Sequence, residues 1–63
     1  MIKLTRLKGE PFLLNCELIE FIEETPDTVI SMTSGRKVVV IESSEEVKER
    51  VIEYKRAIVN WME

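Results

Sequence analysis

Hydrophobic and polar residues alternate at the start of the chain, where Ile2 and Leu4 are separated and followed by polar side chains. Strict alternation is typical of a strand with one buried face. The turn that follows contains Gly9, which can take a positive φ at little cost. We therefore expect a strand over residues 1–7 that forms a hairpin with a short second strand over residues 12–14.

The next segment fits two structures. Asn15 can hydrogen-bond the backbone downstream of it, which favours a capped turn. Residues 18–23 then fit a strand, with Ile19 and Phe21 on one face, although apolar residues four apart also fit a short helix. We favour the strand. Residues 25–27, Thr-Pro-Asp, predict a reversal of the chain after it.

A second hairpin is indicated by two runs rich in β-branched residues, over residues 28–33 and 37–42. Gly35 lies in the short loop between them, where a left-handed residue is needed. The run Val38–Ile41 is apolar at every position, which is typical of a strand buried on both faces. We expect this strand to be central in the sheet.

The last segment carries the start signal of a helix, because Ser43 followed three positions later by Glu46 forms a capping box. We expect a helix over residues 43–60 and a short tail over residues 61–63. A pair of opposite charges four apart, Glu46 and Arg50, predicts a weak ion pair on it. One apolar stripe follows the helix and is formed by Val47, Val51, Tyr54 and Ile58.

Together these elements predict a single domain of the α+β class over residues 1–63. Residues 1–42 form a small, mainly antiparallel β-sheet of four to five strands, followed by one C-terminal α-helix. A chain of 63 residues buries only about 60% of its unfolded surface, and one helix covers one face of a sheet. The sheet must therefore curl into a partial barrel, or a second copy must cover its other face. We favour a homo-oligomer.

Charge and composition exclude several classes of function. The chain has 9 basic and 12 acidic residues, a net charge of −3, no histidine and one cysteine. Binding to duplex nucleic acid is disfavoured, and neither a zinc cage nor a Ser-His-Asp triad can be built. We expect no enzyme activity, no cofactor and no metal. With no apolar run near about 18 residues and no signal peptide, the chain is expected to be cytoplasmic, without a membrane span.

One local electrostatic feature remains, an acidic stretch without any basic residue. It is a candidate docking surface for a basic protein partner, and the simpler interpretation is an ordinary solvated edge. Its members are Glu17, Glu20, Glu23, Glu24 and Asp27.

Trp61 and Met62, close to the C-terminus, are candidates for an oligomer or partner contact. The main apolar stripe of the helix is complete without these two residues. The tryptophan therefore either folds back on the core of its own chain or contacts another molecule. Ile52, Val59 and Met62 form a second stripe, which favours an intermolecular contact.

Several short motifs follow one another in a set order over nearly the whole chain. They are residues 4–7, Gly9, Asn15, Leu18-Ile19-Glu20, Ile22-Glu23, residues 25–30, Gly35, Glu42-Ser43, Glu46-Val47 and Glu53-Tyr54-Lys55. In this order the chain resembles the small flagellar FlbD family of swarming motility proteins. It departs from the usual pattern of that family at Lys8, at Cys16 and in the Trp61-Met62 tail.

This resemblance implies a bacterial accessory protein that supports swarming by raising the power of the flagellar motor. It brings no catalytic residues. From the resemblance and the missing catalytic residues we expect a non-enzymatic module at the periphery of the motor, which docks on stator or rotor components or on something that controls them. The alternative is a nucleic-acid-binding regulator of flagellar genes that uses Arg36, Lys37 and the basic residues of the first strand.

Overall fold

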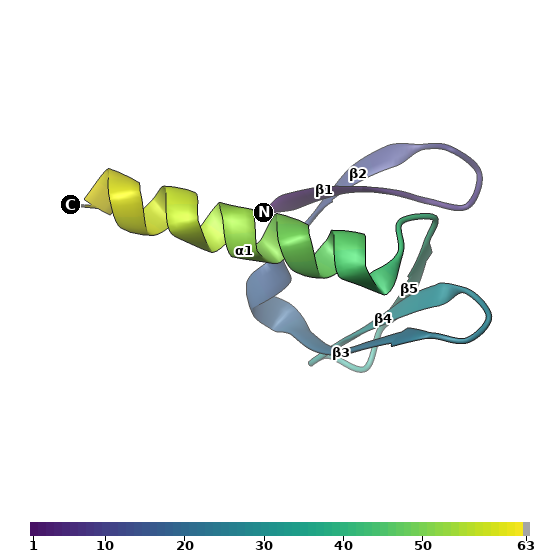
Figure 1. Cartoon of the computed structure of the whole chain (residues 1–63). Helices are drawn as coiled ribbons and strands as arrows, with labels where there is room; N and C mark the ends of the chain where they lie inside the picture. Colours follow the sequence, from purple (N-terminus) through teal and green to yellow (C-terminus); the bar gives the residue numbers. More distant parts are fainter. Residues whose placement is uncertain (63) are drawn as a thin grey trace.

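A computed structural model describes the backbone of residues 1–62 and the side chains of residues 1–59. It confirms an α+β fold with antiparallel strands and one C-terminal helix, but the five strands form two sheets instead of one (Figure 1). The elements are β1 (Ile2–Thr5), β2 (Pro11–Leu14), the 3-10 helix η1 (Cys16–Leu18), β3 (Ile19–Glu24), β4 (Thr28–Met32), β5 (Lys37–Val40) and α1 (Ser44–Met62).

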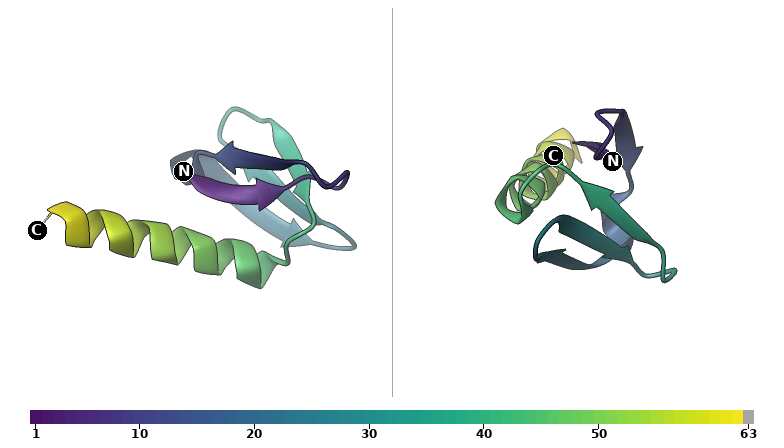
Figure 2. Two further views of the ribbon diagram at one scale, coloured as in Figure 1. Left: turned by 90° about the horizontal axis from the view of Figure 1, so that it is seen from above. Right: turned by 90° about the vertical axis from the view of Figure 1, so that its right-hand side faces the viewer.

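The two sheets meet at one point. The hairpin of β1 and β2 is joined to the β3–β4–β5 sheet by a single antiparallel bridge between Arg6 and Val40. Beside it, the Ile41 amide donates a hydrogen bond of 3.0 Å to the Thr5 carbonyl. The sheets and the helix enclose the core between them (Figure 2). Its buried apolar side chains are Ile2, Leu4, Leu14, Cys16, Ile30, Met32, Val38, Val40 and Val47.

The expectation that Val38–Ile41 forms a central strand buried on both faces is wrong. β5 is an outer strand of its three-stranded sheet, and on its other side it forms one isolated bridge, between Val40 and Arg6. Val38 and Val40 face the core, whereas Val39 is half-buried and Ile41, past the end of the strand, is 58% exposed. The helix and the first hairpin both lie on the inner face, so nothing among the described residues covers the outer one.

Residues 19–24 form a strand, which confirms the favoured interpretation of this segment. The turn before it is capped as expected, because the Asn15 side chain accepts a hydrogen bond of 3.1 Å from the Glu17 amide. The placement of Ile19 and Phe21 on one face is wrong. A register shift between them lets Ile19 pack against the core and leaves Phe21 59% exposed.

Both glycines occupy the left-handed region that their turns require, with φ of 95° at Gly9 and 92° at Gly35. An ideal side chain at either position would meet no atom within 4 Å, so the backbone conformation alone demands glycine there. The Thr25–Pro26 peptide bond in the turn between β3 and β4 is cis.

The helix begins at its predicted cap. The Ser43 hydroxyl accepts a hydrogen bond from the Glu46 amide, and the Glu46 carboxylate accepts one from the Ser43 amide, both of 3.1 Å. The helix then continues to Met62, two residues beyond the expected end, and its C-terminal half extends past both sheets (Figures 1 and 2). No helix within the described residues has the length and apolar composition needed to span a membrane.

Candidate functional site

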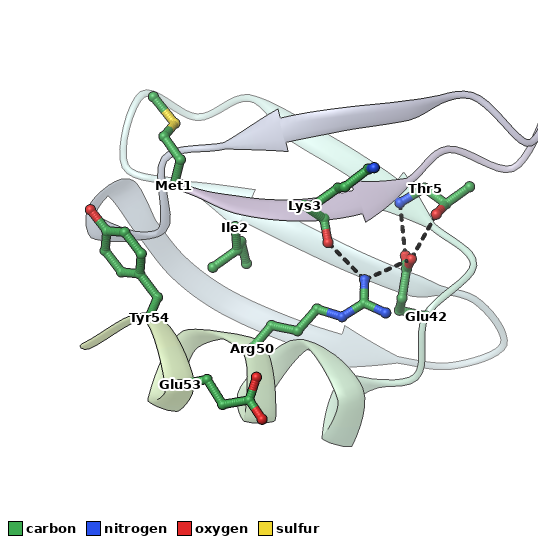
Figure 3. A pocket seen from close by; sticks show the side chains of 8 residues that line it. All are labelled: Met1, Ile2, Lys3, Thr5, Glu42, Arg50, Glu53 and Tyr54. Carbon is green, nitrogen blue, oxygen red and sulfur yellow. Dashed lines mark hydrogen bonds and ion pairs between the residues drawn. The ribbon is translucent and has the colours of Figure 1, made fainter. Parts of the chain in front are cut away.

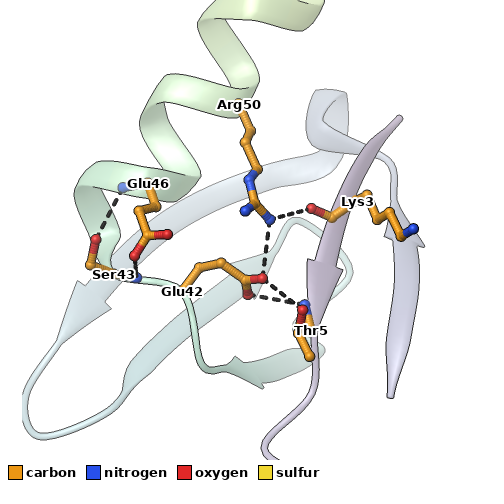
Figure 4. Close-up of polar contacts among 6 residues, drawn as sticks. All are labelled: Lys3, Thr5, Glu42, Ser43, Glu46 and Arg50. Carbon is orange, nitrogen blue, oxygen red and sulfur yellow. Dashed lines mark hydrogen bonds and ion pairs between the residues drawn. The ribbon is translucent and has the colours of Figure 1, made fainter. Parts of the chain in front are cut away.

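A polar cluster ties the helix to the first strand (Figure 4). The Arg50 guanidinium donates to the Glu42 carboxylate at 3.0 Å and to the Lys3 carbonyl at 2.7 Å. The same carboxylate accepts hydrogen bonds from the Thr5 amide, at 3.0 Å, and from the Thr5 hydroxyl, at 2.8 Å. Glu42 is only 6% exposed, so each of its bonds replaces one lost to water.

The ionised form of Glu42 is favoured by these contacts. Burial by itself raises the pKa of the Glu42 carboxyl, but the hydrogen bonds from Thr5 and Arg50 outweigh burial and hold the pKa below its ordinary value. A carboxyl with a lowered pKa stays charged at neutral pH and is a poor proton donor. The cluster therefore joins β1, α1 and the segment between β5 and α1 through one charged pair.

This cluster was not predicted from the sequence. The expected pair of Glu46 and Arg50 is wrong, because the Glu46 carboxylate caps the helix and Arg50 turns to Glu42 and the first strand. Glu42 precedes the helix cap, so the rule for charges four apart on a helix does not reach it. No spacing along the chain signals a partnership between residues 5, 42 and 50.

An open cleft of about 580 Å³ lies beside the cluster, between β1 and α1 (Figure 3). Tyr54 and Met1 border one end of it, and Thr5 and Glu42 border the other. The polar groups at the second end, those of Thr5, Glu42 and Arg50, already bind one another. Its lining residues are Met1, Ile2, Lys3, Thr5, Glu42, Arg50, Glu53 and Tyr54.

The carboxylates of the acidic stretch differ in the contacts that they form within the fold. The Glu24 carboxylate accepts a hydrogen bond of 2.7 Å from the Ser44 amide at the start of α1, and this bond lowers the pKa of Glu24. Glu24 therefore also has a role within the fold, since its carboxylate holds the start of α1. Glu17 lies 3.8 Å from the Lys55 ammonium in an exposed pair of the kind that contributes little to stability.

The remaining carboxylates of the stretch, Glu20, Glu23 and Asp27, are exposed. None of them forms an ion pair or a side-chain hydrogen bond with another described residue. We call these three residues the acidic edge, since β3 is an outer strand of its sheet and Asp27 lies in the turn that follows it. The acidic edge is the part of the predicted docking surface that the fold leaves unused.

The other predicted contact, Trp61 and Met62, lies outside the residues whose side chains are described. The backbone of both belongs to α1, on the part of the helix that extends past the sheets. Cys16 is buried in the core as a free thiol.

The fold and its polar contacts define a small α+β domain built from two short antiparallel sheets and one long helix. A family model described as flagellar and swarming motility proteins matches residues 1–59 of the 63. The chain therefore belongs to the FlbD family, and its role is in flagellar and swarming motility. That description gives no support to the alternative of a regulator that binds nucleic acid. No similar protein was found among curated proteins or solved structures.

Proposed function

We propose that this protein is a non-enzymatic accessory protein of the flagellar motor, acting at its cytoplasmic side. It raises motor power by docking on a stator or rotor component. The observation that carries the proposal is the match to a flagellar and swarming family over residues 1–59. The family description covers flagellar and swarming motility in general. Docking on the motor is our proposal for how this chain supports motility.

The acidic edge supports docking as the mode of action. Three carboxylates, Glu20, Glu23 and Asp27, are free of partners within the described residues, so their charges are available to a basic segment of another protein. Complementary charge speeds encounter and selects partners, and a net charge of −3 points in the same direction. The partner fitted to this edge is a basic cytoplasmic segment of the motor.

Single-motor torque in a motile host tests the proposal. The gene is deleted and then replaced with a variant carrying Glu20→Lys and Asp27→Lys, which reverses two charges of the acidic edge. We expect torque and swarming to fall on deletion and to stay low with this variant. The matched control carries Glu10→Lys and Glu49→Lys, which produce the same net charge at exposed positions elsewhere, and it should restore torque.

The possible outcomes separate the two parts of the proposal. Unchanged torque and swarming after deletion would refute the motor role. Reduced torque after deletion, with full restoration by the acidic-edge variant, would retain the motor role and refute docking through this edge. Circular dichroism of the purified variants establishes that both remain folded.

A further inference from the structure

The outer face of the β3–β4–β5 sheet carries an apolar centre. In the register of the sheet, Val29 lies between Glu23 on β3 and Val39 on β5. The neighbouring row places Phe21 opposite Ser31. Side chains alternate between the faces of a sheet, so these residues point away from the core that their neighbours Ile30, Val38 and Val40 fill.

This face is not covered by any described part of the chain. The helix and the first hairpin pack on the inner face, as their shared core shows (Figure 1). Phe21 is 59% exposed, and Val29 and Val39 are half-buried. Phe21 lies diagonal to Val29, and Val29 lies opposite Val39, so three apolar side chains gather on this uncovered face.

The charges that border this centre are of opposite sign and lie on opposite outer strands. Glu23 is on β3 and Lys37 is on β5, in adjacent rows. Both are exposed, and neither forms an ion pair within the described residues. The face therefore contains its own electrostatic complement: an acidic border on one side, a basic border on the other and an apolar middle.

We propose that a second copy of this chain covers the outer face, forming a twofold-symmetric dimer in which the two sheets pack face to face. In a twofold interface each contact between two different residues occurs twice, so a pairing of Glu23 with Lys37 would form at both borders of the face. Glu23 of each subunit then lies against Lys37 of the partner subunit. Phe21, Val29 and Val39 fill the space between the sheets, which pack about 10 Å apart.

The dimer is reversible. A face of three short strands is smaller than the roughly 800 Å² per partner of a standard interface. It therefore dissociates on dilution of the purified protein. Self-association is measured on the purified chain, so a failure of this inference leaves the motor role in place. The dimer uses Glu23 of the acidic edge, whereas the motor test reverses the other two carboxylates, Glu20 and Asp27.

Sedimentation equilibrium over a range of micromolar concentrations tests the inference. The wild type should show a concentration-dependent mass between 7.4 kDa and twice that value. Glu23→Lys and Lys37→Glu should each raise the dissociation constant about tenfold or more, because each places like charges together at the border. The double variant, Glu23→Lys with Lys37→Glu, should return the constant close to that of the wild type.

Matched controls and an apolar variant complete the experiment. Glu10→Lys and Lys8→Glu make the same charge changes in the exposed turn between β1 and β2, and they should leave the dissociation constant unchanged. Phe21→Ser, at an exposed position that the fold tolerates, should weaken the dimer. A wild type that is monomeric at every concentration, or a double variant as weak as the single ones, would overturn the inference.

Discussion

Arg50 and Glu42 form an ion pair of 3.0 Å that spans the junction between the helix and the end of the second hairpin. Arg50 is 40% exposed and Glu42 is 6% exposed, so the pair lies at the boundary between core and solvent. Through Thr5 and the Lys3 carbonyl, the same two side chains also hold β1. β1 reaches the larger sheet by a single bridge only, so this pair is a principal link between the two halves of the fold.

Replacing Arg50 with alanine should lower the free energy of unfolding by about 1–2 kcal/mol, because a nearly buried carboxylate loses its cation. In a domain of this size that is a fall in melting temperature of roughly 5–15 °C. Urea unfolding and a thermal melt measure both values. Arg56→Ala, at an exposed helix position, is the control and should change little. Equal effects of the two variants would show that the link to Glu42 adds no stability.

The lowered pKa of Glu42 predicts how stability depends on pH. A carboxyl whose pKa is lower in the folded than in the unfolded state stabilises the fold above its unfolded pKa, about 4.3. That stabilisation is lost as the pH falls from there through the lowered folded value. The wild type should therefore exceed Glu42→Gln in stability at pH 7, by a margin that shrinks towards low pH. Urea unfolding at several pH values measures the margin, and a constant margin would contradict the prediction.

The Ser43 hydroxyl, which caps the helix, should contribute to the stability of the fold. Ser43→Ala removes the acceptor of the Glu46 amide and should cost about 1 kcal/mol. Ser43→Asp supplies another good capping acceptor and should remain close to the wild type. Thermal melts of the three proteins make the comparison. If alanine and aspartate gave the same melting temperature, the bond at Ser43 would not stabilise the start of the helix.

Two glutamates of the acidic stretch, Glu20 and Glu24, should differ in how much stability the fold loses when each is replaced by lysine. Glu24→Lys removes the acceptor of the Ser44 amide and puts a positive charge at the positive end of the helix dipole, so the melting temperature should fall. Glu20→Lys changes an exposed side chain without a partner among the described residues, and the melting temperature should stay within about 4 °C, because surface changes usually cost no more than about 0.5 kcal/mol. A loss of stability in both variants would show that Glu20 also stabilises the fold, which contradicts the prediction.

The sequence by itself determined the local elements of this protein. Alternating apolar positions, two glycines with positive φ and the capping box of Ser43 and Glu46 each act within a few residues. Such signals are sufficient for two hairpins, a C-terminal helix and the α+β class. The acidic stretch is likewise visible in the sequence, because it needs only the count of charges along residues 17–27.

Only the tertiary structure decided which side chains meet. Arg50 bonds the carbonyl of a residue 47 positions away, and Ser44 donates to Glu24 across 20 positions. No local pattern encodes such distances, since they depend on how two sheets and a helix pack around one core. The same packing places Phe21 outside after a register shift and leaves Val39 on an uncovered face. The run of apolar residues in β5 is identical in either arrangement, so the sequence pattern alone could not distinguish a central strand from an outer one.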